Sequence, residues 1–62
     1  MSFKRGDLVL LRADRIYESY GKQPEYYIVL KNYQENLISI HGSKTKDTIA
    51  VFEEDLILLS SV

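Results

Sequence analysis

The chain has 62 residues, of which eight are basic and nine acidic, so its net charge at pH 7 is −1. This length predicts a single domain over residues 1–62, and the near-neutral charge argues against a strongly polyanionic partner. The absence of cysteine excludes disulfides and thiolate chemistry. Apolar runs much shorter than the roughly 20 residues that cross a bilayer, and the lack of a signal peptide, predict a cytoplasmic protein without a membrane partner.

The first predicted strand follows a turn near the N-terminus. The segment FKRGDLVLLRA contains a Gly-Asp turn signal and then an apolar run, which indicates a strand over residues 8–12. Val9 and Leu11 share one face of that strand, and Leu8 and Leu10 share the other. Both faces are apolar, as expected where two sheets fold over one another.

A long loop is predicted next, over residues 13–25. Its sequence, ADRIYESYGKQPE, lacks regular alternation, and Gly21 and Pro24 oppose a continuous helix or strand. We expect no helix here or elsewhere in the chain. Loops of this length in a compact domain are often functional.

The segment EYYIVLKN, residues 25–32, gives the strongest strand signal because it is rich in aromatic and β-branched residues. Its alternation places Tyr26 in phase with Ile28 and Leu30, and we expect these three side chains to face the core. Tyr27 then lies on the opposite face.

The second half of the chain predicts three short strands separated by polar turns. The strands are expected over residues 37–41, 48–52 and 57–62, with connections at 32–36, 42–47 and 53–56. The side chains expected to point inward are Ile38, Ile40, Ile49 and Val51. Several short strands between turn signals favour an all-β fold, a small barrel or sandwich.

The pattern GDLVLL, the long loop, the three meandering strands and VFEEDLILL together resemble the SH3-like barrel in its bacterial Tudor-like and KOW-like forms. This resemblance implies a small five-stranded SH3-like barrel with a long loop between strands 1 and 2. It also implies a short helical turn before the last strand, whose Leu56 plugs the core. Glu53, Glu54 and Asp55 are then expected on the solvent side of that turn.

A narrower resemblance connects RGDLVLL and GKQPEYYIVLKN to the start of PemK-like toxin ribonucleases. In those toxins an Arg-Pro pair ends the long loop, and its arginine takes part in RNA cleavage. Here the corresponding pair is Gln23-Pro24, so that arginine is missing, and the chain is far shorter than such toxins. We therefore expect no ribonuclease, no catalytic residue and no cofactor.

His41 and the acidic cluster at residues 53–55 are the remaining groups that could carry chemistry. A general acid–base role for His41 needs a positioned partner, and a metal site needs further ligands at suitable spacing. Neither pattern is present, so a surface position at a strand end is expected for His41. Adjacent acids in a turn do not converge on one point, and no metal site is expected.

Tyrosines supply the predicted binding surface. The chain has five of them, and tyrosine suits binding sites because its rigid apolar ring carries a hydrogen-bonding hydroxyl. SH3-like domains commonly bind through aromatic residues of this loop and the adjacent strands. The resemblance thus implies a non-enzymatic module that docks a protein partner, as a small accessory protein of a bacterium or phage. The predicted partner-binding residues are Arg12, Arg15, Tyr17, Tyr20, Lys22, Tyr27 and Tyr33.

Three alternatives remain open at this point. Tyr17 and Tyr20 either form the binding surface or fold back over the core, while Tyr27 and Tyr33 are expected to reach the outer surface. A weak, salt-sensitive site for single-stranded nucleic acid is the alternative function, formed by the basic and tyrosine residues between Arg12 and Lys22. The outer face of the first strand, together with the run LILL near the end of the chain, could instead form a homodimer contact.

Overall fold

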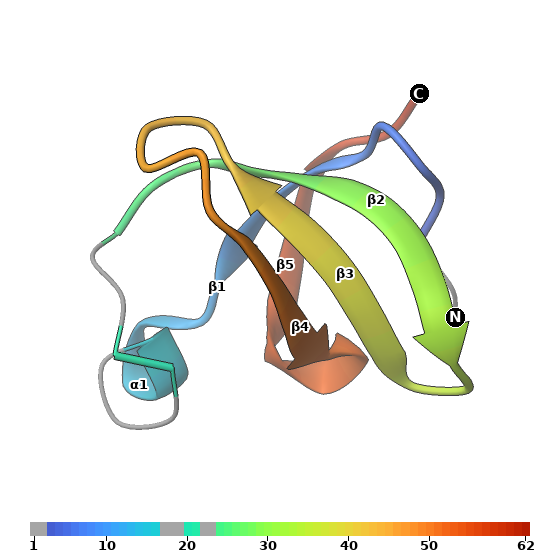
Figure 1. Cartoon of the computed structure of the whole chain (residues 1–62), viewed down its shortest axis with the longest axis horizontal. Helices are drawn as coiled ribbons and strands as arrows, with labels where there is room; N and C mark the ends of the chain where they lie inside the picture. The colour runs from blue at the N-terminus through green and yellow to red at the C-terminus, as the bar shows by residue number, and fades with distance from the viewer. Residues whose placement is uncertain (1–2, 17–19, 22–23) are drawn as a thin grey trace.

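The computed structural model describes residues 3–16, 20–21 and 24–62. Five antiparallel strands form one strongly curved sheet in the order β4-β3-β2-β1-β5 (Figure 1). The strands are β1 (Leu8–Leu11), β2 (Tyr27–Gln34), β3 (Leu37–Gly42), β4 (Thr48–Phe52) and β5 (Leu56–Ser60). A 3₁₀ turn, η1 (Glu53–Asp55), precedes β5. The predicted all-β fold with five strands is confirmed, and the strands follow one another along the chain as expected.

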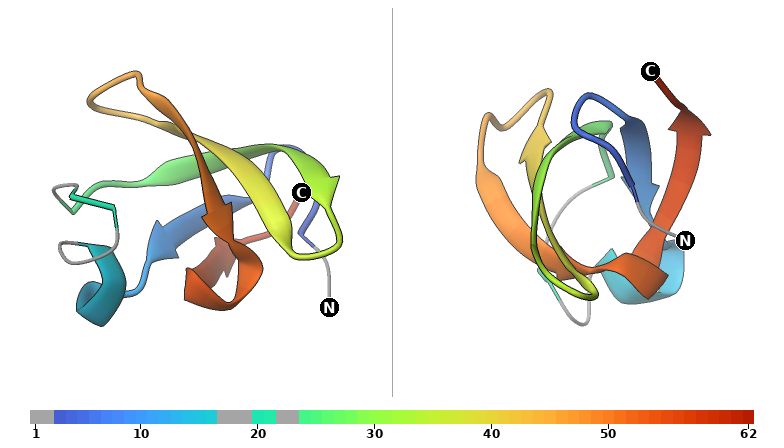
Figure 2. Two further views of the ribbon diagram at one scale, coloured as in Figure 1. Left: turned by 60° about the horizontal axis from the view of Figure 1, so that its bottom comes forward. Right: turned by 90° about the vertical axis from the view of Figure 1, so that its right-hand side faces the viewer.

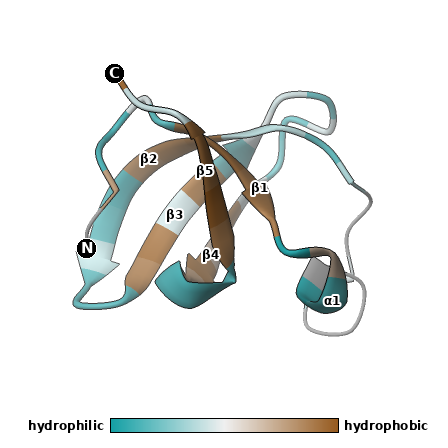
Figure 3. Ribbon diagram, turned by 180° about the vertical axis from the view of Figure 1, so that it is seen from behind, coloured by the Kyte–Doolittle hydropathy of each residue, from teal (hydrophilic) through white to brown (hydrophobic). Residues whose placement is uncertain are grey.

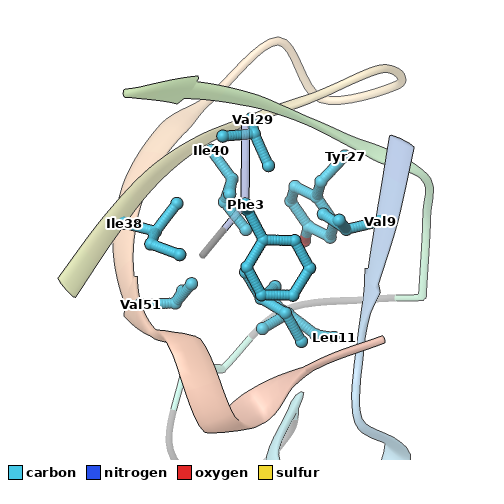
Figure 4. Close-up of a cluster of buried hydrophobic side chains, with 9 residues drawn as sticks. Phe3, Val9, Leu11, Tyr27, Val29, Ile38, Ile40 and Val51 are labelled. Atoms are coloured by element: carbon cyan, nitrogen blue, oxygen red, sulfur yellow. The ribbon is translucent and has the colours of Figure 1, made fainter. Parts of the chain in front are cut away.

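Nine apolar side chains from all five strands and the N-terminal segment form the core (Figure 4). Val9 and Leu11 of β1 are buried as expected, and Leu56 closes the core after η1. Val51 of β4 is also buried, whereas Ile49, two residues earlier, is only half-buried and packs against the edge of the cluster. A core this small removes little apolar surface from water, so polar contacts at its rim matter for stability.

β2 faces the core with the opposite set of side chains from the one expected. Tyr27 and Val29 are almost completely buried, whereas Tyr26 and Ile28 are 56% and 41% exposed. The prediction of Tyr26 in the core and Tyr27 at the surface is therefore wrong. Both phases of this run are apolar, so alternation alone does not choose the inner face. The choice follows from the register, which pairs Tyr27 with the buried Val9 of β1.

The connection between β1 and β2 contains one helical turn, α1 (Ala13–Ile16), that the sequence did not lead us to expect. The backbone N–H of Arg15 donates to the carbonyl of Arg12 at 3.0 Å. Asp14 in the first turn and Arg15 in the last turn carry the charges that a helix dipole favours. These local contacts stabilise a single helical turn, so the expectation that this connection has no helix is wrong for residues 13–16.

The predicted strand boundaries shift by one or two residues at several ends. β2 continues to Gln34, beyond the expected end at residue 32, because register shifts after Val29 and after Asn32 keep it paired with β3. β5 begins at Leu56 and ends at Ser60, instead of spanning residues 57–62.

The predicted Gly-Asp turn before β1 is present and connects the segment from Lys4 and the C-terminal Val62 to the sheet. Gly6 has a φ of 96°, which favours glycine, and its N–H donates to the Val29 carbonyl at 2.8 Å. The buried Asp7 carboxylate accepts hydrogen bonds from the backbone N–H of Lys4 at 2.8 Å and of Val62 at 3.2 Å. Residues 4–7 thus run beside β2.

The sheet curls around the core so that its two terminal strands, β4 and β5, are connected through η1 (Figure 2). Each of these strands has one hydrogen-bonded neighbour among the described strands, β3 for β4 and β1 for β5. In the described part of the chain, no helix has the length and apolar character needed to cross a membrane.

Candidate functional site

Tyr20, one of the predicted binding tyrosines, is an anchor between the long connection and η1. Its hydroxyl donates to Asp55 Oδ2 at 2.7 Å and accepts a hydrogen bond from the Phe52 N–H at 3.1 Å. Arg15 Nε lies 3.3 Å from Asp55 Oδ1. The Tyr20 side chain is half-buried and packs against the core. For Tyr20, the core-covering alternative is therefore the one that the structure supports.

Asp55 completes this tyrosine anchor, which we define as Arg15, Tyr20 and Asp55. Asp55 is 4% exposed, so the prediction that it lies on the solvent side of the turn is wrong. A carboxylate can be buried here because Arg15 neutralises it and the Tyr20 hydroxyl donates to it. Burial, together with the neighbouring Asp55 carboxylate, raises the pKa of the Tyr20 hydroxyl above its ordinary value.

The predicted binding residues do not form one surface. Arg15 and Tyr20 lie in the tyrosine anchor, and Arg12 forms an exposed ion pair with Asp14 at 3.3 Å. Tyr33, near the end of β2, is 54% exposed, so its expected exposure is confirmed, and this end of β2 is far from α1 in Figure 1. Tyr17 and Lys22 lie outside the described residues.

Tyr27, expected at the outer surface, is instead a core residue that is 1% exposed. Its hydroxyl makes no hydrogen bond of standard geometry in the described part of the chain. The Glu25 carboxylate is nevertheless close enough to act on it electrostatically. Burial, together with the negative charge of Glu25, raises the pKa of Tyr27 to about 12. A buried, uncharged tyrosine of this kind contacts no external partner.

Glu25 holds the turn between β3 and β4. Its Oε1 accepts hydrogen bonds from the backbone N–H groups of Lys44 at 2.7 Å and Thr45 at 3.0 Å, and its Oε2 accepts one from the Thr45 hydroxyl at 2.8 Å. A Cβ atom at Gly42 would lie 2.7 Å from Glu25 Oε2, so only glycine leaves room for this carboxylate. Burial alone would raise the pKa of Glu25, but these hydrogen bonds outweigh it and lower the pKa.

A basic hollow of about 360 Å³ lies on the outer face of the sheet. Its lining residues are Arg5, Leu30, Lys31, Tyr33, Ser39 and Thr48. Lys31 is paired with Ser39, whose chain neighbours Ile38 and Ile40 point into the core, so these two side chains face outward. Leu30, expected in the core, lines this hollow. The pairing of Gly6 with Val29 brings Arg5 beside this part of β2.

The two charged residues that line the basic hollow, Arg5 and Lys31, are both positive. Arg5 and Lys31 are exposed, and neither forms an ion pair with any described carboxylate. The Lys31 ammonium lies 4.9 Å from the centroid of the Tyr33 ring, a cation–π distance. At the far edge, His41 Nδ1 and Thr48 Oγ1 are hydrogen-bonded at 2.9 Å, so His41 has a local polar partner on the surface.

A second candidate surface is aliphatic and covers β1, β5 and the adjacent part of β2. Its outward-facing residues are Leu8, Leu10, Ile28, Ile57 and Leu59, and we call them the aliphatic surface; Leu58 is paired with the buried Val9 and so lies on the other face of the sheet. Ile57, Leu58 and Leu59 are 47%, 38% and 44% exposed. Figure 3 shows β1 and β5 side by side, both strongly hydrophobic. Leu10 is paired with Ile57, and Leu8 with Ile28, which makes the surface continuous.

Some of these residues carry a signal in the sequence and others do not. The run LILL is visible as an apolar segment with no charge. Arg5, by contrast, joins the basic hollow only because a turn runs beside β2, and Ser39 and Thr48 do so through strand pairing. No pattern of spacing along the chain reveals that proximity.

Comparison with known proteins identifies no relative. No family model matches the chain, and neither a curated protein nor a solved structure does.

Proposed function

We propose that the chain is a small, non-enzymatic protein-interaction module, a cytoplasmic SH3-like barrel that binds through the aliphatic surface. One observation supports this proposal above the others: β5 is a terminal strand with three half-exposed aliphatic side chains, Ile57, Leu58 and Leu59. A terminal strand offers unpaired backbone groups to another chain, and proteins usually protect such strands with lysine, proline or a covering segment. Residues 56–62 contain no lysine, no other charged side chain and no proline.

The partner that best fits this surface is a second copy of the chain. Because residues 56–62 carry no charge, the surface has no charge pattern that would select a partner of opposite sign. Two copies can meet there without repulsion, since each has a net charge of only −1. If the two β5 strands pair antiparallel about Leu58, Ile57 of one copy lies opposite Leu59 of the other. A two-fold contact of this kind is self-complementary.

The expected association is weak. Burying five or six half-exposed aliphatic side chains on each of the two copies contributes about 8–16 kcal/mol, whereas association costs about 4–15 kcal/mol in lost translational and rotational freedom. The contact also covers less than the about 800 Å² per partner found in stable complexes. We therefore expect a dimer that forms between tens of micromolar and millimolar concentrations.

Sedimentation velocity over about 10 µM to 1 mM tests the proposal. The wild-type chain should shift from monomer to dimer, and Ile57→Lys should remain monomeric because it places two ammonium groups in the contact. Phe52→Lys is the matched control, since Phe52 has the same 47% exposure but lies on β4. Equal dimerisation of wild type and Ile57→Lys, or a monomer throughout, would contradict self-association through β5.

A further inference from the structure

The basic hollow is separate from the aliphatic surface and combines three features that the proposed function does not use. Two cations, Arg5 and Lys31, line it without a carboxylate partner among the described residues. The Tyr33 ring is 54% exposed beside them. The Glu25 and Asp55 carboxylates are engaged elsewhere, with the turn between β3 and β4 and with Arg15. A locally positive hollow therefore exists on a chain whose net charge is −1.

We propose that this hollow binds single-stranded nucleic acid, with Arg5 and Lys31 holding one or two phosphates and Tyr33 stacking on an adjacent base. Single strands are held by this combination of cations that follow the backbone and aromatic rings that accept bases of any sequence. The site differs from the basic segment between Arg12 and Lys22 that the sequence suggested, since Arg12 is paired with Asp14.

The Lys31–Tyr33 contact favours a nucleic acid over an acidic peptide. The Lys31 ammonium lies over the Tyr33 ring at 4.9 Å, which orients the ring beside the cation. An acidic peptide would use the two cations but would gain little from a flat exposed ring, whereas a nucleotide uses both the charge and the ring. The exposed Thr48 side chain adds a hydroxyl group to the lining of the same hollow, whereas Ser39 is only 2% exposed.

The number of cations sets a measurable salt dependence. For single strands, the logarithm of the binding constant falls with the logarithm of salt concentration by about 0.7 per neutralised phosphate. Two contacts therefore predict a slope of about −1.4, which is a loss of about sevenfold between 50 and 200 mM salt. The Tyr33 contribution, by contrast, should be nearly independent of salt.

An amide NMR titration with the oligonucleotide (dT)₈ at about 20, 50 and 200 mM NaCl tests the proposal. Wild-type shifts should centre on Arg5, Lys31 and Tyr33. Arg5→Gln should reduce the salt slope to about −0.7, and Arg5→Lys should restore it. Tyr33→Leu should weaken binding by about five- to hundredfold with the slope unchanged. All three side chains are exposed, and the amide spectra of the variants report directly whether each one is folded.

Arg12→Gln is the matched control, because it removes the same charge from an exposed site near α1 and should leave the affinity unchanged. Absence of shifts at the lowest salt would overturn the proposal, as would equal weakening by Arg12→Gln and Arg5→Gln. Equal binding of an octaglutamate peptide, or shifts with inorganic phosphate alone, would also overturn it. Ile57→Lys should bind (dT)₈ like the wild type, so failure of self-association and failure of this site are distinguishable.

Discussion

The Tyr20 hydroxyl donates a 2.7 Å hydrogen bond to Asp55, which is 35 residues further along the chain. This bond holds the long segment between β1 and β2 against the turn before β5. The same oxygen accepts the Phe52 N–H, which lies at the end of β4. One hydroxyl therefore links the connection to both strands that flank η1. Tyr20, which the sequence indicated as a binding residue, therefore has a structural role in this fold.

Removal of that hydroxyl should destabilise the protein. We expect Tyr20→Phe to lower the free energy of unfolding by about 1–3 kcal/mol, because a hydrogen bond to a buried charged group is lost and Asp55 is left partly unsatisfied. Urea denaturation measures this change. Tyr33→Phe is the control, since the Tyr33 ring is exposed, and it should alter stability by less than about 0.5 kcal/mol. Equal stability of both variants would show that Tyr20 is not an anchor.

Glu25 should make the fold sensitive to acid. Its pKa is lower in the folded protein than its ordinary value of 4.5, so its stabilising contribution is complete above that value and is lost as the pH falls through the folded pKa. The urea concentration at the midpoint of unfolding should therefore decrease as the pH is lowered from about 5 to about 3. This decrease should be smaller for Glu25→Gln than for the wild type. Glu54→Gln removes the same charge from an exposed position and should behave like the wild type. If stability decreased with falling pH by the same amount in Glu25→Gln and in the wild type, Glu25 would not be the cause of the acid sensitivity.

Tyr27 should make the fold sensitive to base. The pKa of Tyr27 is about 12 in the folded protein and 10.0 ordinarily. The neutral form of this side chain is therefore favoured more in the folded state than in the unfolded state. That contribution is complete below pH 10 and is lost as the pH rises towards 12.

Tyr27→Phe should therefore lose less stability than the wild type between about pH 8 and pH 11. At neutral pH it should change the free energy of unfolding by less than about 1 kcal/mol, since it removes a buried hydroxyl without a well-formed hydrogen bond. Tyr27→Ala should cost about 3–5 kcal/mol because it leaves a cavity. A large loss in Tyr27→Phe at neutral pH would show that the hydroxyl is well bonded.

The sequence determined the strands better than it determined which side chains face the core. Turn signals at Gly6-Asp7 and residues 42–47 delimit segments whose residues strongly favour strands, so the five strands could be predicted. The inner face of β2 could not, because Tyr26 and Tyr27 are chemically alike and only pairing with Val9 distinguishes them. Side-chain alternation determines the buried face only where one of the two faces is polar.

The candidate sites depend still more on distant pairing. The burial of Asp55 requires Arg15 and Tyr20 to approach η1, and no local pattern around residues 53–55 reveals this. The basic hollow likewise depends on Arg5 lying beside β2 through the Gly6–Val29 hydrogen bond. Of the aliphatic surface, only the outer face of β1 and the uncharged run LILL were visible in advance, because they are local features; Ile28 was expected in the core.

Isotope-filtered NMR on a mixture of ¹³C-labelled and unlabelled chains detects contacts only between different copies, and so reports association through β5 without signals from contacts within one copy. We predict intermolecular contacts between the methyl groups of Ile57 and Leu59 at millimolar concentration, and their loss in Ile57→Lys but not in Phe52→Lys. Intermolecular contacts confined to other strands, or none while the chain sediments as a dimer, would contradict association through β5.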